Sequence, residues 1–195
     1  RLRHDEHWHT YWRNPGDSGL PTTIEWQLPA GARIGDIEWP APKRLPIGPL
    51  VNYGYEDDLL LPALFTAPAN ARPGQDLVLR AQANWLVCKD VCIPETGEFE
   101  LRLPVVAAGT TPGGTATSAM FERAAAQRST PLQGWTAELQ QQGRDVLLTL
   151  QADGDAPLPA GLPELQVFPF DEQLIDPAVH ELHRTPRGYA LKMKL

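Results

Sequence analysis

Apolar and polar residues follow a strand-like pattern in the first hundred residues. Residues 22–28 and 98–106 alternate between apolar and polar positions, the period of a strand with one buried face. The strand candidates in this part of the chain are residues 22–28, 34–39, 59–66, 76–87 and 98–106. Pro62 interrupts one of them, which indicates an edge strand or a bulge there. Without a helical period between them, these segments predict an antiparallel sandwich of immunoglobulin type.

The pattern changes after residue 106. Residues 107–115 are small residues with almost nothing to bury, as in a linker, and Ser118 is suited to cap a short helix over residues 119–127. Strand patterns then resume at residues 135–139, 146–151, 165–168 and 189–195.

We therefore predict an all-β protein with two domains and a short helix after the linker. The first immunoglobulin-like domain covers residues 1–108, the linker covers 109–116, and a second immunoglobulin-like domain covers 117–195. The last strand pattern reaches the final residue, so we expect this second domain to be incomplete.

Composition supports a β protein and excludes several other classes. The 195 residues include 20 prolines and 16 glycines, a density that a helix bundle or coiled coil does not tolerate. With 42% hydrophobic residues the chain can still form a core. The net charge of −7 argues against nucleic acid as a partner, because binding phosphates requires an excess of Lys and Arg.

No apolar run approaches the roughly 18–20 residues that span a bilayer. The chain begins at Arg1, without an initiator methionine or a signal peptide. We expect it to be a soluble fragment, excised or processed from a longer protein.

The two cysteines, Cys88 and Cys92, are separated by three residues. Along one extended strand, residues at this spacing lie about 13 Å apart. A disulfide needs Cα atoms within about 4.4–6.8 Å of each other. If the cysteines pair, the chain must turn back between them, with residues 89–91 forming the turn of a tight hairpin.

A bridge across so short a loop removes little chain entropy and adds little stability. A weak, exposed bridge is suited to being made and broken, so the spacing favours redox exchange. A structural disulfide and a pair of reduced core cysteines remain alternatives. The spacing also fits zinc ligands, but no second pair of Cys or His follows at a suitable distance, and we expect neither a metal site nor a cofactor.

Three histidines near the start of the chain, His4, His7 and His9, form a cluster of possible copper or zinc ligands. The alternative, which we favour, is that His9 belongs to a structural strand while His4 and His7 lie on a frayed terminus.

Two separate motifs carry a resemblance to a known family. Residues 9–19 read HTYWRNPGDSG, and residues 84–95, about 65 residues further on, read NWLVCKDVCIPE, with Trp26 between them. Together they resemble the periplasmic N-terminal region of the DsbD/ScsB family of thiol:disulfide interchange proteins. The ScsB branch, named for suppression of copper sensitivity, is the more similar one. The motifs cover roughly residues 1–106.

The resemblance implies a periplasmic protein-disulfide reductase, the soluble part of an inner-membrane protein. In that family, a membrane-embedded domain and a thioredoxin-like periplasmic domain deliver electrons. The immunoglobulin-like domain then reduces disulfides of periplasmic partners. The expected partners are thus thioredoxin-like proteins or domains and the membrane-embedded part of the same full-length protein. Cytochrome c biogenesis and copper tolerance are the associated processes.

The resemblance also suggests site residues. By analogy with the DsbD branch, Cys92 forms the mixed disulfide and Cys88 resolves it, although that branch has a longer spacing between its cysteines. A cap loop that shields the sulfurs corresponds to residues 48–55, with the candidate residues Leu50, Val51, Asn52 and Tyr53. This segment lacks the acidic pair and the matching aromatic residue of the DsbD branch. A non-catalytic immunoglobulin-like binding module and a copper-binding domain are the alternative functions.

Overall fold

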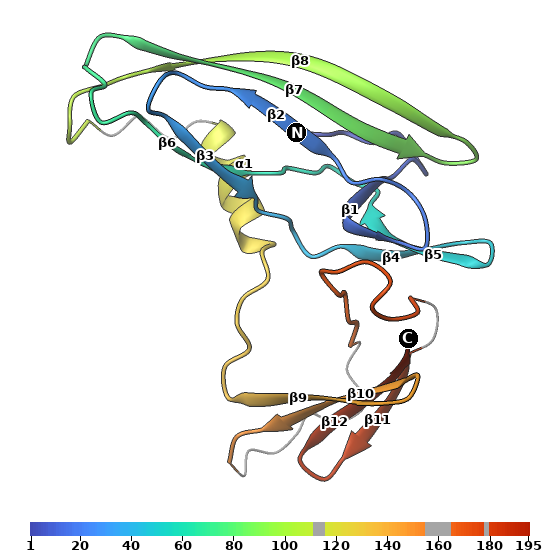
Figure 1. Cartoon of the computed structure of the whole chain (residues 1–195). Coiled ribbons are helices and arrows are strands. Elements are labelled where there is room, and N and C mark those ends of the chain that lie inside the picture. Colours follow the sequence, from blue (N-terminus) through green and yellow to red (C-terminus); the bar gives the residue numbers. More distant parts are fainter. Residues whose placement is uncertain (111–115, 155–164, 178–179) are drawn as a thin grey trace. The chain divides into compact units, whose positions relative to one another are not determined.

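The computed structural model describes residues 1–110, 116–154, 165–177 and 180–195 (Figure 1). Within them lie twelve strands and one helix, α1 (Ala116–Ala126). The strands are β1 (Thr10–Gly16), β2 (Thr23–Gln27), β3 (Arg33–Ile37), β4 (Lys43–Ile47), β5 (Leu50–Tyr55), β6 (Ala63–Thr66), β7 (Asp76–Cys88), β8 (Cys92–Pro104), β9 (Trp135–Gln142), β10 (Asp145–Ala152), β11 (Glu181–Thr185) and β12 (Gly188–Lys194). The prediction of an all-β, immunoglobulin-like protein with a short helix is confirmed.

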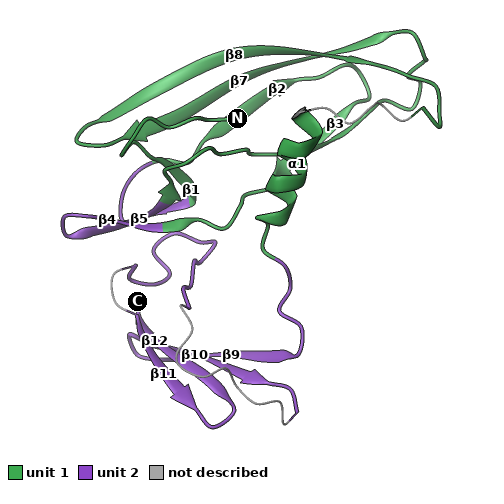
Figure 2. Ribbon diagram, turned by 180° about the vertical axis from the view of Figure 1, so that it is seen from behind, with its two compact units in different colours: residues 1–13, 20–43, 54–129 green, residues 14–19, 44–53, 130–195 purple. Residues whose placement is uncertain are grey.

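The chain divides into two compact units (Figure 2). The first comprises residues 1–13, 20–43 and 54–129, and the second comprises residues 14–19, 44–53 and 130–195. Helix α1 groups with the first unit in this division. The domain boundaries proposed from composition, with a linker at 109–116, stay a prediction.

The first unit is dominated by the long hairpin of β7 and β8, which Figure 1 shows with β2 beside β7. Each hairpin strand has 13 residues, and the register pairs Asp76 with Pro104 at one end and Cys88 with Cys92 at the other. In β7 the buried residues Leu77, Leu79 and Ala83 lie at odd positions, which gives the strand one core-facing side.

A second, two-stranded sheet in the first unit pairs β3 with β6, and its register shifts between Ile34 and Ile37. The strand predicted at residues 59–66 is shorter in the structure, because β6 begins only at Ala63, after Pro62. The predicted interruption at this proline therefore lies at the strand's start.

The second unit contains a four-stranded antiparallel sheet in the order β11-β12-β10-β9. Strand β12 alternates over its second half, with Leu191 and Met193 buried and Lys192 and Lys194 exposed. Leu191 and Met193 form a core with Val146 of β10 and with Ile175.

Strands β1, β4 and β5 form a further sheet in the order β1-β5-β4. Sequence periodicity did not predict β4 or β5, because the last four residues of β5 are all buried and β4 contains Pro46. Their connection is a turn at residues 48–49, where Gly48 has φ 61°. A left-handed turn of this kind favours glycine.

The strand predicted at residues 165–168 is wrong. This segment carries no ladder pairing in the structure, and Pro169 after it lacks a backbone donor. Its apolar side chains still pack: Val167 lies against the core of the second unit, and the ring of Phe168 contacts that of Tyr53 edge to face at 5.1 Å. The apolar residues of this segment therefore pack against their neighbours although the segment is not paired in a sheet.

Helix α1 has 11 residues, and no helix in the described part of the chain is long and apolar enough to cross a membrane.

Candidate functional site

Cys88 and Cys92 form a disulfide at the end of the β7–β8 hairpin, with their Cα atoms 4.1 Å apart. They are the last register pair of the ladder, so the strands themselves bring them face to face. The intervening residues 89–91 form the turn, and the amide of Lys89 donates to the carbonyl oxygen of Val91 at 3.1 Å. The hairpin predicted from the spacing is therefore present.

The two cysteines differ strongly in exposure. Cys88 is 2% exposed, whereas Cys92 belongs to the exposed residues. Around Cys92 the hairpin end presents apolar side chains to solvent, since Val91 is 64% exposed and Ile93 is also exposed. An incoming partner can thus approach the bridge from the Cys92 side and find an apolar surface there.

The start of β1 and the residue before it cover the Cys88 side of the bridge. The backbones of His9 and Cys88 exchange two hydrogen bonds, each 2.9 Å between nitrogen and oxygen. His9 is 4% exposed and its ring meets that of Tyr11 edge to face, with 5.2 Å between the ring centroids. Cys88 is therefore buried beside a segment that is held to it by main-chain hydrogen bonds.

Tyr11 connects strand β1 to the sulfur of Cys92. Its hydroxyl oxygen lies 3.8 Å from Cys92 Sγ and 3.3 Å from His9 Nε2, while the residue itself is only 2% exposed. Burial raises the pKa of the Tyr11 phenol and lowers the pKa of the His9 imidazole. Both shifts favour the neutral forms, so the bridge is bordered by an uncharged phenol and an uncharged imidazole.

The proposed cap residues lie on strand β5, within a hairpin with β4, and not in an irregular loop. Leu50 is exposed and Val51 is half-buried. Asn52 and Tyr53 are buried, and Asn52 Oδ1 accepts hydrogen bonds from the amide and the hydroxyl of Ser18, both at 3.1 Å. Their role as a cap over the sulfurs stays a prediction.

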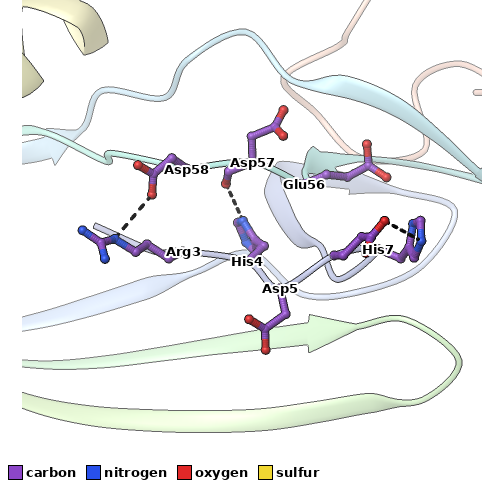
Figure 3. Close-up of a pocket in the computed structure, with 8 residues that line it drawn as sticks. Arg3, His4, Asp5, His7, Glu56, Asp57 and Asp58 are labelled. Atoms are coloured by element: carbon purple, nitrogen blue, oxygen red, sulfur yellow. Dashed lines mark hydrogen bonds and ion pairs between the residues drawn. The ribbon is translucent and has the colours of Figure 1, made fainter.

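The three histidines of the N-terminal segment have different surroundings in the structure. His4 and His7 line a surface hollow together with Asp5, Glu56 and Asp57 (Figure 3). Both ring nitrogens of His4 already have protein partners, the carbonyl oxygen of Asp57 at 2.5 Å and Thr10 Oγ1 at 2.9 Å.

His7 extends toward Glu6, with 3.5 Å between Nε2 and the carboxylate, and His9 faces Tyr11. Among the residues that the structure describes, no three His, Cys, Asp or Glu side chains are grouped to hold a metal ion. The interpretation of His9 as a strand residue agrees with its backbone pairing to Cys88.

Sequence reasoning missed Tyr11 as a site residue, and it considered His9 as a structural strand residue or a metal ligand but not as a neighbour of the sulfurs. The contact between Tyr11 and Cys92 joins residues 81 positions apart, so no local period announces it. His9 and Tyr11 do both belong to the HTYWR segment that carries the family resemblance. That co-occurrence of two distant motifs was the one available signal.

Comparisons with known proteins agree with this arrangement. The family model "Thiol:disulfide interchange protein DsbD, N-terminal" matches residues 1–104, more than half of the chain. The crystal structure of the N-terminal periplasmic domain of ScsB from Proteus mirabilis is similar, with a TM-score of 0.62 and 16% sequence identity. The match covers 97% of this chain and 70% of that one, and at this identity it speaks for the fold. A search of curated proteins found no match.

The family match thus spans both motifs, the hairpin and its Cys88–Cys92 disulfide. The chain belongs to the DsbD N-terminal family and is a thiol:disulfide interchange domain.

Proposed function

We propose that this chain is a periplasmic protein-disulfide reductase that works through Cys88 and Cys92. It accepts two electrons from a thioredoxin-like domain, supplied in turn by a membrane-embedded part of the full-length protein, and passes them to disulfides of periplasmic partner proteins. The observation that supports this most directly is the pairing of an exposed Cys92 with a buried Cys88 at the end of a hairpin. Only one residue of such a pair is exposed to a partner.

The exchange proceeds in two displacements. In the first, the Cys92 thiolate attacks one sulfur of the partner's disulfide, and the second partner sulfur leaves as a thiolate. A Cys92–partner mixed disulfide results. In the second, Cys88 loses its proton and attacks Cys92 Sγ, so the Cys88–Cys92 bond forms and the first partner sulfur leaves. Two electrons have then moved to the partner, whose thiolates take up protons.

The burial of Cys88 fits the resolving role. Attack on Cys92 takes place within the hairpin, where the register already holds the two Cα atoms 4.1 Å apart, so it requires no access from solvent. The same burial keeps foreign disulfides away from Cys88. Re-reduction by a thioredoxin-like dithiol reverses the two steps, with attack on the exposed Cys92 sulfur.

Two single substitutions test this proposal. The reduced protein is mixed with an oxidised thioredoxin-like protein, and the products are resolved without reductant. With Cys88→Ala we expect a mixed disulfide that accumulates and is released by dithiothreitol. With Cys92→Ala we expect no adduct and no transfer. If both variants still reduce the partner as wild type does, the proposal is wrong.

A redox titration separates exchange from a structural bridge. A potential below about −300 mV would mark the Cys88–Cys92 bond as structural and contradict the proposal. A potential near that of thioredoxin, about −270 mV, or higher would support exchange.

A further inference from the structure

The Tyr11 hydroxyl is the side-chain donor placed against the sulfur that carries the proposed exchange. Its oxygen lies 3.8 Å from Cys92 Sγ, within hydrogen-bonding range for sulfur, and it reaches this position from a residue that is 2% exposed. The backbone near Tyr11 is held in place, because His9, two residues earlier, forms two main-chain hydrogen bonds with Cys88.

The direction of the hydrogen bonds follows from counting protons. A disulfide sulfur has no hydrogen, so Tyr11 must donate its single O–H to Cys92 Sγ. The phenol oxygen is then left as an acceptor, and His9 Nε2, 3.3 Å away, must donate to it. A neutral imidazole does so as the tautomer with its proton on Nε2. The resulting series runs from His9 through Tyr11 to Cys92.

The surroundings keep both groups in these forms. Burial is the main cause that lowers the pKa of His9; nearby Glu56 acts in the opposite direction and His4 in the same direction. Burial also raises the pKa of Tyr11, so the phenol retains its proton over the range in which thiols titrate. Tyr11 is thus suited to donate a hydrogen bond and unsuited to act as a base.

We propose that Tyr11 is a catalytic hydrogen-bond donor that stabilises the Cys92 thiolate, and that His9 is a positioning residue that holds the phenol in its donor orientation. This inference rests on the proposed exchange through Cys92.

In the reduced protein the negative charge of Cys92 faces the Tyr11 O–H, and a hydrogen bond to a charged group is stronger than one to a neutral group. The donor favours thiolate formation before Cys92 attacks a partner. In re-reduction, the second thiolate of the electron donor attacks the donor sulfur of the Cys92–donor mixed disulfide, a bond forms between the two donor sulfurs, and the electron pair of the broken bond moves onto Cys92 Sγ. The same O–H group stabilises that leaving thiolate, and no proton leaves Tyr11 in either step.

The expected effect of removing the hydroxyl can be stated as a shift. Hydrogen bonds to charged groups contribute enough that losing this one should raise the pKa of the Cys92 thiol by about one unit. Near neutral pH the thiolate fraction then falls about tenfold, while a more basic thiolate is a better nucleophile, so the rate of attack should fall about threefold.

The test uses the Cys88→Ala background, in which Cys92 is the single cysteine of the chain. The rate of alkylation by iodoacetamide is followed against pH, which gives the pKa of Cys92 without any protein partner. Tyr11→Phe keeps the buried ring and removes the oxygen. His9→Phe keeps a ring against Tyr11 and removes Nε2, while its backbone can still pair with residue 88.

Tyr55→Phe is the matched control. Tyr55 is also buried in the first unit, and its hydroxyl donates to the carbonyl oxygen of Pro40 at 2.8 Å. This variant loses a buried hydroxyl elsewhere, so it should leave the alkylation profile of Cys92 unchanged. Circular dichroism of each variant verifies that it is folded.

We expect Tyr11→Phe to raise the pKa of Cys92 by about one unit and His9→Phe to raise it by a smaller amount. A Tyr11→Phe profile that coincides with that of Tyr55→Phe would overturn the inference. If Tyr11→Phe does not fold, an unchanged profile in His9→Phe would overturn the assigned series of hydrogen bonds.

The alkylation profile tests the role of Tyr11, and the mixed-disulfide assay tests the proposed function, so either proposal can be refuted without the other. A raised pKa in Tyr11→Phe together with no transfer to partners in wild type would refute the proposed function and leave the hydrogen bond to Cys92 in place. Normal transfer with no pKa shift would refute the role of Tyr11 alone.

Discussion

The main chains of His9 and Cys88 exchange a reciprocal pair of hydrogen bonds, each 2.9 Å long. This pairing joins the N-terminal HTYWR segment to the cysteine hairpin, the two parts of the chain that carry the family resemblance. Because the bonds involve only backbone atoms, they do not depend on the oxidation state of the sulfurs. The environment of Cys88 should therefore persist when the disulfide opens.

Reduction of Cys88–Cys92 should lower the free energy of unfolding by only about 2 kcal/mol, because the bridge closes a very short loop. The ladder of β7 and β8, with its 13-residue strands, holds the hairpin together in either state. Urea unfolding of the oxidised and the reduced protein measures the difference. A reduced protein that is unfolded in buffer would show that the bridge is a structural staple.

Stability should decrease as the pH falls through the range in which His9 titrates. Burial lowers the pKa of His9 from its ordinary value of 6.5, so the unfolded chain binds a proton there that the folded chain resists. Unfolding is then favoured progressively below pH 6.5. His180, whose pKa is also lowered mainly by burial, contributes in the same direction.

Thermal unfolding across this range, in wild type and in His9→Phe, measures the contribution of His9. The slope of stability against pH should be smaller in the variant. The carboxylates of Asp57 and Asp58, whose pKa values are lowered by Lys43 and Arg1, lose their contribution only at more acidic pH, below their ordinary 3.8. Equal slopes for the two proteins above pH 5 would contradict the prediction.

Asn14→Ala should destabilise the second unit by about 3 kcal/mol. The Asn14 side-chain amide donates to the carbonyl oxygens of Pro169 and Asp171, at 2.9 and 3.0 Å, and its Oδ1 accepts from the amide of Gly16 at 3.0 Å. The residue is 2% exposed, so water cannot replace these partners.

Asn14→Asp tests whether the side chain at position 14 acts as a hydrogen-bond donor. An ionised carboxylate has no proton to donate to the two carbonyl oxygens, so this variant should be less stable than Asn14→Ala at neutral pH and recover part of the loss on acidification. Asn84→Ala is the control, because the hydrogen bond that Asn84 Oδ1 accepts from Thr96 is exposed and its loss should cost under about 1 kcal/mol. Denaturant unfolding compares all three variants.

Sequence periodicity predicted β7, which has one buried face, and also β8, none of whose residues is buried. Over residues 76–83 strand β7 alternates between more buried and more exposed residues, and the structure gives the strand almost the predicted bounds. Strand β1, in contrast, buries Thr10, Tyr11 and Trp12 in succession, so it has no period of two to detect. Residues 165–168 failed for the opposite reason, since apolar side chains there are packed without a ladder partner.

The part of the candidate site formed by residues close together in the sequence was predictable. The spacing of Cys88 and Cys92 already required a tight turn for any bridge between them, and the register confirms the hairpin. The contact of Tyr11 with Cys92 depends on the bridge between Cys88 and His9, the residue before β1, which no local pattern encodes. A strand that meets a turn from far away in the sequence becomes visible only in the folded chain.

The position of the bridge in the ladder has a consequence for how partners distinguish the two redox forms. Cys88 and Cys92 are already opposite each other by register, so making or breaking the bond between them leaves the course of β7 and β8 as it is. Little structural reorganisation then accompanies the transfer of electrons. We expect donor and acceptor proteins to meet one and the same docking surface, with the driving force set by relative potentials and not by a change of shape.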